Sequence, residues 1–303
     1  MTIPFVRDIE FEYGKVEQVS PLIRRVIANN PGPFTYVGTG VYIIGHGEVA
    51  VIDPGPHDAE HFEALKAALK GETVKCVLVT HGHSDHSPLE RPLAEWAGCK
   101  VYAKDCGQPT AKGELGSEDD VGFHPDELVG DGDVFSGPGW TLEVIETPGH
   151  TCSHICFDLK EENACLTGDH IMGWSTTIVA PPDGHMADYF KSLDKVQARG
   201  FDILWPTHGS PIEGRDFVHA FIAAYRQHRQ DREDGVIAQL KSGETSIPNM
   251  VDAMYVGLEP RLIPAACMSV LGHMVKLIDE GRVVCSADIP VVQSAYRLVD
   301  VDA

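Results

Sequence analysis

The sequence of 303 residues lacks any continuous apolar run that approaches the roughly 20 residues needed by a membrane-spanning helix. Residues Met1 to Asp8 also lack the charged and apolar regions of a secretory signal. Basic residues are scarce: 24 Lys and Arg stand against 45 Asp and Glu, which gives a formal net charge of −21. This acidity opposes non-specific binding to nucleic acid, although it does not exclude a local basic groove. We therefore expect a cytoplasmic protein with no membrane partner.

The sequence also lacks a C-x-x-C pair, a spacing found in many zinc and redox sites, although it contains eight cysteines. Several of them lie inside apolar stretches, where a free cysteine behaves as a small hydrophobic residue. A disulfide framework is unusual in a chain of this length without a secretion signal. We expect these cysteines to be reduced and mostly structural: Cys76, Cys99, Cys106, Cys152, Cys156, Cys165, Cys267 and Cys285.

The hydrophobic pattern over residues 5–215 changes between strand and helix periods, which is typical of α/β layering. A helix is expected over 58–70, with Asp58 as its cap and Gly71 as its stop, and another over 88–98. Residues 105–133 show no clear period and are interpreted as a long irregular connection. Strands are predicted at 11–16, 21–27, 41–44, 49–52, 74–80, 101–103, 140–145, 164–167 and 201–206.

The densest group of polar residues is His-Gly-His-Ser-Asp-His at 81–86, directly after the apolar stretch 74–80. This context places the group on the turn that leaves the C-terminal end of a buried strand. Imidazoles and carboxylates are ligands that zinc accepts. Four such side chains within six residues are too many for one open catalytic site and suit two neighbouring metal ions: His81, His83, Asp85 and His86.

Three more candidate ligands occur in the same context, just beyond an apolar strand and beside a glycine. They are His150, Asp169 and His208, which follow the predicted strands at 140–145, 164–167 and 201–206. Glycine allows the backbone to approach closely at such positions. An α/β active site gathers side chains from several strand ends, so we expect all seven ligands at one edge of the sheets.

The pattern becomes helical from about residue 216. Helices are expected over 216–240, from the Thr245-Ser246 cap to Tyr255, and over 264–281, followed by a strand at 282–285. We interpret residues 216–303 as a small winged-helix-like domain after a catalytic domain of residues 1–215. Arg226, Arg229 and Arg232 share one face of the first helix, and the acidic residues among them favour a solvated, salt-bridged face.

These motifs together resemble the metallo-β-lactamase superfamily. The resemblance covers about residues 20–215, and Asp53 in Val-Ile-Asp-Pro-Gly matches the family's early aspartate. The overall length, the 30–33 turn and the helical C-terminal region are most similar to the β-lactamase-like protein 2 group, with a weaker match over 264–266 and 271–283. The motif residues, in chain order, are His81, His83, Asp85, His86, His150, Asp169 and His208.

The resemblance implies an αββα sandwich that holds two metal ions, usually zinc, with manganese or iron also possible. The first ion would be held by His81, His83 and His150, and the second by Asp85, His86 and His208. Asp169 would bridge the two ions, which would convert water to hydroxide near neutral pH. Two carboxylates would have catalytic roles: Asp85 would orient the nucleophile, and Asp53 would hydrogen-bond a ligand histidine.

The predicted function is that of a metal-dependent hydrolase in which hydroxide attacks an ester, thioester or lactone carbonyl. Asp169 stands where antibiotic-hydrolysing relatives typically have Cys or Ser, which disfavours β-lactamase activity. The alternative is a single-strand-specific endoribonuclease, in which the C-terminal domain would help to hold RNA. A third hypothesis, a non-enzymatic nucleic-acid or protein-binding module, conflicts with the complete ligand set.

The remaining expectations concern residues around the ligands and the partners of the protein. His154 and His170 are expected to pack beside the ligands or to support them, because the ligand set is already full. Trp174 and His185, on Gly- and Pro-containing loops, could contact substrate, and Trp174 could equally cover the core. The partners would be a small ester or thioester, or single-stranded RNA, and the apolar faces of the C-terminal helices suit a homodimer.

Overall fold

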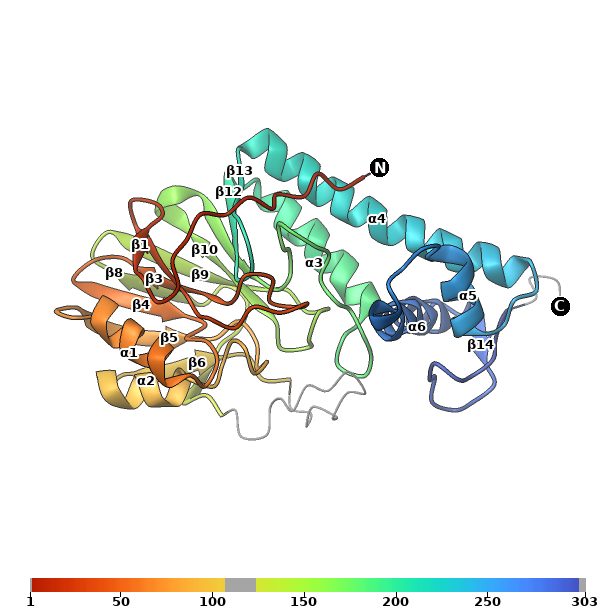
Figure 1. Cartoon of the computed structure of the whole chain (residues 1–303), viewed down its shortest axis with the longest axis horizontal. Coiled ribbons are helices and arrows are strands. Elements are labelled where there is room, and N and C mark those ends of the chain that lie inside the picture. The colour runs from red at the N-terminus through yellow and green to blue at the C-terminus, as the bar shows by residue number, and fades with distance from the viewer. Residues whose placement is uncertain (1, 107–123, 300–303) are drawn as a thin grey trace.

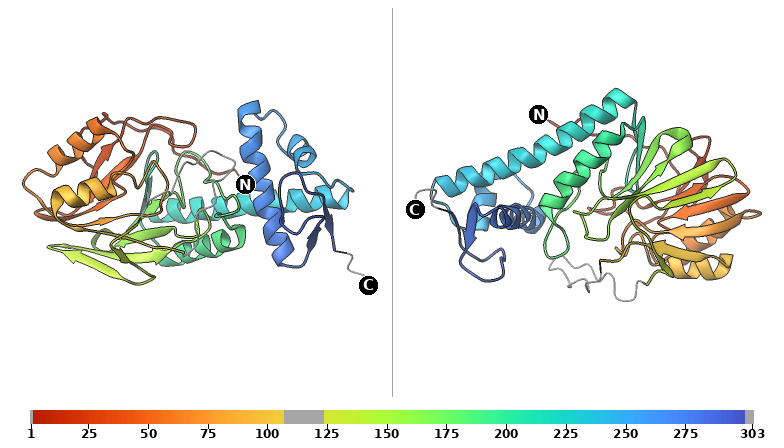
Figure 2. Two further views of the ribbon diagram at one scale, coloured as in Figure 1. Left: turned by 90° about the horizontal axis from the view of Figure 1, so that it is seen from below. Right: turned by 180° about the vertical axis from the view of Figure 1, so that it is seen from behind.

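The computed structural model describes residues 2–106 and 124–299. Two mixed β-sheets pack face to face, and each sheet carries helices on its outer face (Figures 1 and 2). Helices α1 (Ala59–Ala68) and α2 (Glu90–Ala97) cover the first sheet. Helices α3 (Met186–Arg199) and α4 (Arg215–Lys241) cover the second sheet. The expected αββα sandwich is confirmed.

The first sheet has seven strands in chain order, antiparallel from β1 to β4 and parallel from β4 to β7. The strands predicted at 41–44 and 49–52 are confirmed as the antiparallel neighbours β3 and β4, and so is helix α1 with the Asp58 side chain as its N-cap. The strands are β1 (Glu17–Gln18), β2 (Ile23–Ile27), β3 (Gly40–Ile44), β4 (Glu48–Ile52), β5 (Thr73–Leu78), β6 (Lys100–Ala103) and β7 (Glu127–Leu128).

The second sheet has six strands in the order β13-β12-β11-β10-β9-β8. Its neighbours are antiparallel except for β11 and β12, which run parallel. The 3-10 turn η1 (Lys160–Glu162) links β10 to β11. The strands are β8 (Val134–Gly137), β9 (Trp140–Glu146), β10 (Ile155–Leu159), β11 (Ala164–Gly168), β12 (Ile203–Pro206) and β13 (Ile212–Glu213).

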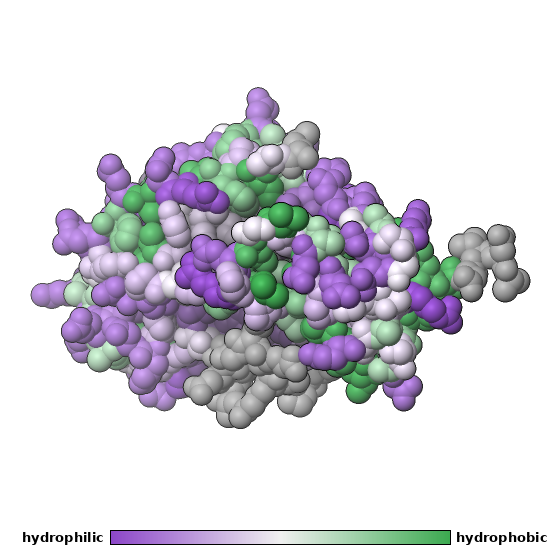
Figure 3. Space-filling model, turned by 45° about the vertical axis from the view of Figure 1, so that its right-hand side comes forward, coloured by the Kyte–Doolittle hydropathy of each residue, from purple (hydrophilic) through white to green (hydrophobic). Residues whose placement is uncertain are grey.

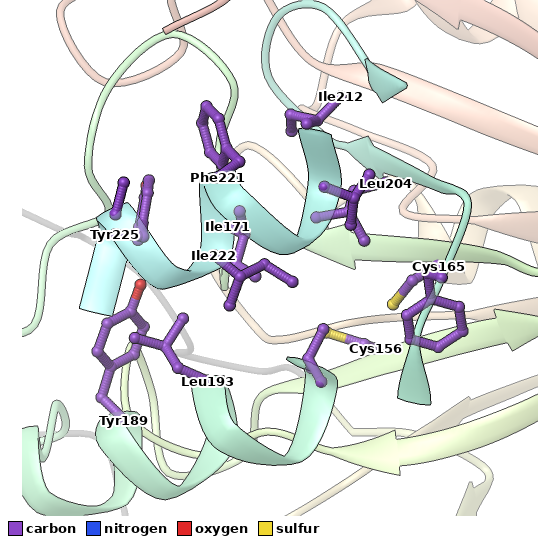
Figure 4. Packing of buried hydrophobic residues seen from close by; sticks show 14 of the residues in the cluster. Cys156, Cys165, Ile171, Tyr189, Leu193, Leu204, Ile212, Phe221, Ile222 and Tyr225 are labelled. Atoms are coloured by element: carbon purple, nitrogen blue, oxygen red, sulfur yellow. The ribbon is translucent and has the colours of Figure 1, made fainter. Parts of the chain in front are cut away.

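Strand alternation separates the core into layers. Val41 and Ile43 of β3 pack with the helix α1 residue Leu65, whereas Tyr42 and Ile44 pack between the two sheets. A further cluster lies between the second sheet and helices α3 and α4, as Figure 4 shows for ten labelled residues. The inner strands β3, β4, β10 and β11 are buried on both faces, which explains why strands such as 41–44 and 49–52 are continuous apolar runs.

The C-terminal region is built around the second half of α4. It contains α5 (Ile247–Met254), the 3-10 turn η2 (Pro260–Leu262), α6 (Ile263–Asp279) and the antiparallel pair β14 (Val283–Cys285) and β15 (Tyr296–Leu298). These elements match the predicted helices and strand. Within the described residues, the helical stretch Pro260–Asp279 is long and apolar enough to cross a membrane, but half of it is buried inside the protein. Its apolar side chains form the core of this region.

Helix α4, which runs across the top of Figure 1, connects the sandwich to the C-terminal region. Its N-terminal half contributes Val218, Phe221 and Tyr225 to the core under the second sheet. Its C-terminal half contributes Val236 and Leu240 to the C-terminal core. The domain boundary at residue 215 stays a prediction, because one continuous helix belongs to both packing units.

Three predictions about local structure need correction. Residues 11–16 form no strand, because the chain turns at Tyr13 and Gly14, where Gly14 has φ +66°. The connection predicted over 105–133 lies partly outside the described residues, and its last part contains the short strand β7 paired with β6. The expectation that the cysteines are all reduced is wrong for Cys106 and Cys152, which form a disulfide.

The disulfide joins two segments that follow different strands and are 46 residues apart in sequence, with Cα atoms 6.0 Å apart. Cysteine spacing alone gives no signal for a pairing of this kind, since it depends on two loops that meet in space. The other six cysteines are free, and Cys76, Cys156, Cys165 and Cys267 are buried as expected. On the face shown in Figure 3, hydrophilic residues cover most of the surface and apolar residues form patches between them.

Candidate metal centre

The loops that follow β5, β9, β11 and β12 meet at one edge of the sandwich. The loop after β5 carries residues 81–86, and the loop after β9 carries His150. Asp169 directly follows β11, and His208 follows β12. The structure thus brings together all seven predicted ligands, in three overlapping groups: His81, His83 and His150; His81, His86 and Asp169; Asp85, His86 and His208.

Three imidazoles form the first cluster. Nδ1 of His83 lies 2.9 Å from Nε2 of His81 and 3.2 Å from Nε2 of His150. A neutral imidazole has one donor and one acceptor nitrogen, so three ring nitrogens that converge on one point cannot all be satisfied by each other. A metal ion that accepts all three lone pairs suits this arrangement.

The second cluster is made by Asp85, His86 and His208. Oδ2 of Asp85 lies 3.0 Å from Nε2 of His208 and 3.6 Å from Nε2 of His86. Nε2 of His86 and Oδ1 of Asp169 are buried without a hydrogen-bond partner among the residues that the structure describes. Buried polar atoms are normally paired, and these two have the lone pairs that a cation needs.

Asp169 lies between the two clusters with one oxygen toward each. Its Oδ2 is 3.7 Å from Nε2 of His150, and its Oδ1 is 3.5 Å from Nε2 of His86 and 3.4 Å from Nε2 of His208. A carboxylate in this position fits the bridging role that the resemblance implies.

The electrostatics of the first cluster and of Asp169 suit a bound cation. Burial and the neighbouring imidazoles lower the pKa of His150 to about 4 and hold the pKa of His81 well below its usual range. Burial raises the pKa of Asp169, but the nearby imidazoles of His208 and His86 outweigh it and hold that pKa well below its usual range. His81 and His150 therefore offer neutral imidazoles and Asp169 offers a carboxylate, the protonation states that metal binding requires.

Asp53 is completely buried beneath the second cluster and supports it. Its Oδ2 accepts hydrogen bonds from Nδ1 of His86 at 2.9 Å, Oγ1 of Thr80 at 2.8 Å and Oγ1 of Thr207 at 3.2 Å. Its Oδ1 accepts one from the Thr80 amide at 2.7 Å. Asp53 has φ +49°, so the chain holds a non-glycine residue in the left-handed region to aim this carboxylate. The contact with His86 fixes the tautomer in which Nε2 can coordinate a metal.

The other ligand rings are oriented in the same way. Nδ1 of His150 donates to the carbonyl of Ile178 at 2.6 Å, and Nδ1 of His208 donates to the carbonyl of Gly38 at 3.1 Å. Both contacts direct Nε2 toward the clusters.

His154 supports the site without joining either cluster. Its Nε2 accepts the backbone N–H of Asp169 at 3.1 Å, and its Nδ1 lies 2.9 Å from Oγ1 of Thr147. His170 is also buried, and burial lowers its pKa to about 3. His154 thus supports the site, whereas His170 packs beside it against the rings of His154 and Tyr189.

The two residues proposed to contact substrate lie in different surroundings. His185 places Nδ1 at 2.7 Å from Asp188 and Nε2 at 3.1 Å from Asp279 of α6, so both nitrogens face carboxylates. Trp174 stacks on Tyr36, with ring centroids 4.8 Å apart, and lies against Gly209. Trp174 therefore stays a candidate wall of the site, whereas His185 links α3 to the C-terminal region.

Apart from Asp53, the residues that hold the ligands and their surroundings were not expected from the sequence. Thr80 and Thr207 each precede a ligand histidine, and a hydroxyl at the end of an apolar strand is a signal that could have found them. Tyr225 and Arg229 of α4 reach the site through backbone groups of the 172–178 segment, for which the sequence contains no signal.

The comparisons agree with this geometry. Residues 36–208 match the Metallo-beta-lactamase superfamily, and residues 246–289 match the Beta-lactamase associated winged helix domain. The chain is 29% identical to the Lactamase-like protein adaB of Aspergillus niger over 92% of this chain and 90% of that protein. It is 33% identical to an Atrochrysone carboxyl ACP thioesterase of Aspergillus fumigatus, over 83% and 75% of the two chains. It is 32% identical to a Beta-lactamase-like protein 2 homolog of Caenorhabditis elegans, over 76% and 74%.

Among solved structures, the fold is similar to that of a Beta-lactamase domain protein from Burkholderia ambifaria, with a TM-score of 0.78, 22% identity and 96% of each chain covered. A metallo-beta-lactamase family protein from Thermus thermophilus gives a TM-score of 0.73 at 23% identity, over 93% of this chain and 100% of that chain. The family match covers more than half of the chain and includes every ligand candidate. The chain therefore belongs to the metallo-β-lactamase superfamily, as a hydrolase with a His/Asp metal site and a C-terminal β-lactamase-associated winged helix domain.

Proposed function

We propose that the protein is a dinuclear metal hydrolase that cleaves thioesters or similarly activated carbonyl esters. The observation that carries the proposal is the pair of ligand clusters with one Asp169 oxygen facing each. His81, His83 and His150 would hold one ion and Asp85, His86 and His208 the other. Zinc suits these ligands best, and manganese or iron could also occupy them.

When bound, paired ions supply a strong nucleophile from water at neutral pH and polarise the carbonyl that it attacks. Among the protein's own side chains, Asp85 would orient the attacking water. Although burial raises the pKa of Asp85, the imidazoles of His86 and His208 outweigh it and hold that pKa below its usual range. Asp85 is therefore a carboxylate that can accept a hydrogen bond from the attacking water and fix its direction.

Thioesters fit this site because of their leaving group. Hydrolysis forms a C–O bond and breaks the C–S bond, and a thiol has a pKa of about 8.5, so the thiolate leaves more easily than an alkoxide. A strong general acid is not needed. Relatives whose names state thioesterase activity are 30% and 33% identical to this chain, which supports this substrate class.

Phosphodiester cleavage of single-stranded RNA is the weaker alternative. It would require phosphate neutralisation near the site or by the C-terminal domain. Residues 215–303 carry nine Lys and Arg against twelve Asp and Glu, without a basic cluster. Of the three aligned arginines, Arg226 already pairs with Asp194 at 2.6 Å and Arg229 is buried.

The test is hydrolysis of acyl thioesters of N-acetylcysteamine by zinc-loaded protein, with the released thiol measured by a thiol-reactive dye. We expect release by the wild type and none by the Asp85→Ala/His86→Ala double variant, which controls for contaminating enzymes. End-labelled single-stranded RNA is tested in parallel. RNA cleavage by the wild type alone, with no thioester hydrolysis, would replace this proposal with the endoribonuclease alternative.

A further inference from the structure

Arg229 does not lie where its sequence pattern predicts. Arg226 is exposed and salt-bridged as expected, but Arg229 has only 3% of its surface exposed, so the prediction of a solvated face is wrong for this residue. A spacing of three residues is less than one helical turn, so Arg229 is rotated by about 60° around the helix axis relative to Arg226. This rotation places Arg229 in the interface between α4, α3 and the 172–178 segment.

The buried guanidinium is held by a backbone carbonyl and an aromatic ring. Nη2 of Arg229 donates to the carbonyl of Thr177, and its Cζ lies 5.4 Å from the ring centroid of Tyr189. Within residues 2–106 and 124–299, it forms no ion pair with a carboxylate, because Glu233, one turn further on α4, is bound by Lys276 at 2.9 Å. A buried cation without a counter-ion is costly, so the contacts that it makes must be strong or functionally important.

Tyr225, one turn before Arg229, holds the same segment. Its hydroxyl accepts the backbone N–H of Thr177 at 3.0 Å and that of Met172 at 3.3 Å, and it donates to the carbonyl of Ser175 at 2.6 Å. Figure 4 shows Tyr225 on α4 and Tyr189 on α3 in the same interface. Helix α4 therefore binds Thr177 at both its N–H group and its carbonyl.

The segment that α4 holds orients a predicted metal ligand. The carbonyl of Ile178, the next residue, accepts the hydrogen bond from Nδ1 of His150 at 2.6 Å, and Oγ1 of Thr177 lies 3.3 Å from the same nitrogen. Since Nδ1 carries the proton, Nε2 is left unprotonated and points toward His83. A shift of Thr177 would move the acceptor that sets both the tautomer and the direction of this ring.

We propose that Arg229 is a positioning residue for the first metal site: through Thr177 and Ile178 it fixes the imidazole of His150, with Tyr225 as its partner on the same helix. The inference rests on the proposed dinuclear site. It assigns to α4, the helix that continues into the C-terminal domain, control over one of the two ions. A residue that only packs the core would instead affect the stability of the whole protein and both ions alike.

The experiment measures the affinities of the two ions separately. Metal-free protein is titrated with Co²⁺ or Zn²⁺ against a competing chelator, and the cobalt absorption spectrum reports the ligand set. We expect Arg229→Met to weaken the binding of one of the two ions by 10- to 100-fold, the range found when groups that orient metal ligands are removed. The affinity for the other ion should not change. Arg229→Lys should recover part of the affinity, because an ammonium can donate to the same carbonyl. Tyr225→Phe should weaken the same ion.

Two variants that each lack one ligand cluster show which of the two ions depends on Arg229. In His208→Ala, where the first cluster is intact, Arg229→Met should still weaken the remaining ion. In His150→Ala, where Arg229 has no ligand to position, it should cause no further loss. Arg226→Met, which removes an exposed arginine from the same helix, is the matched control and should bind both ions normally.

Equal weakening of both ions in Arg229→Lys or Tyr225→Phe, or unchanged binding of both ions in Tyr225→Phe, would overturn the inference, even if Arg229→Met fails to fold. A wild type that binds only one ion would overturn the dinuclear site beneath it. A wild type that binds two ions but hydrolyses no thioester would refute the proposed substrate and leave this inference standing.

Discussion

Asp53→Asn is the substitution that tests the site most directly, because it changes one atom of a completely buried side chain. In the native protein, Oδ2 of Asp53 accepts from Nδ1 of His86 at 2.9 Å while Oδ1 accepts the Thr80 amide at 2.7 Å. Asparagine has a single oxygen and cannot satisfy both donors. Each of its two orientations therefore has a definite consequence.

If the asparagine oxygen stays on the Thr80 amide, its NH₂ group faces His86. The ring must then lose the proton on Nδ1 and carry it on Nε2, where it blocks metal coordination. If the amide is reversed, the His86 contact survives but the buried Thr80 N–H loses its acceptor, a loss of about 1–3 kcal/mol in the free energy of unfolding. In the first orientation, the protein should bind the second ion 10- to 100-fold more weakly, a loss of about 1.4–2.8 kcal/mol in binding free energy.

The assay combines the chelator titration with urea unfolding of the metal-free protein. We expect Asp53→Asn to weaken binding of the second-cluster ion more than that of the first, the opposite selectivity to Arg229→Met. Asp53 reaches a ligand of the first ion, His81, only through the hydroxyl of Thr80, which lies 3.0 Å from Nδ1 of His81. Thr207→Val removes a hydrogen bond of 3.2 Å to the same Oδ2 without altering the tautomer, so its effect on metal affinity should be smaller. Wild-type affinity for both ions together with wild-type stability in Asp53→Asn would refute the reasoning.

Three further predictions concern stability. Glu233→Ala should lower the free energy of unfolding by about 3 kcal/mol in urea titration, because it leaves Lys276 without its buried partner. Burial raises the pKa of Glu233, but hydrogen bonds from His273 and Lys276 outweigh burial and lower that pKa overall. Glu233 therefore stabilises the protein above the usual pKa of a glutamate, and the difference in stability between variant and wild type should shrink as the pH falls through the folded pKa. Gly149→Ala should destabilise by about 1–3 kcal/mol, measured by the same titration, because its Cβ would lie 2.5 Å from Cα of Tyr189 at a φ of +143°; wild-type stability would show that the loop yields freely. Removal of metal with a chelator should lower the melting temperature, since each ion at a hundredfold excess over its Kd contributes about 2.7 kcal/mol, and an unchanged melting temperature would contradict a metal-stabilised fold.

The layers and the ligands could be predicted because their signals are local. A strand that is buried on both faces reads as a short apolar run, and a polar residue just after such a run has few structural reasons to be there. This holds for His81, Asp169 and His208 alike. The same reasoning fails for residues 11–16, where a weak alternation is interrupted by a turn at Gly14.

The supporting contacts could not be predicted because one partner in each is a backbone group or a distant loop. Arg229 donates to the Thr177 carbonyl, and every residue has a carbonyl, so no sequence position marks the acceptor. An arginine three residues from an exposed, salt-bridged arginine looks equally solvated until the helix is placed against its neighbours. Cys106 and Cys152 are similar, since their pairing depends on the meeting of two loops.

The continuity of α4 gives the C-terminal region a role that its own surface does not reveal. The predicted boundary at residue 215 separates the ligands from the helix that orients one of them, because Tyr225 and Arg229 both lie beyond it. The N-terminal half of α4 also buries Phe221 against the second sheet, so the helix is needed by the sandwich for its core as well as for its site. The second half of α4 carries Glu233, which binds Lys276 of α6. Contacts within the C-terminal domain therefore fix the same helix that fixes Thr177, and under the proposed role of Arg229 this helix connects the domain to the first metal site.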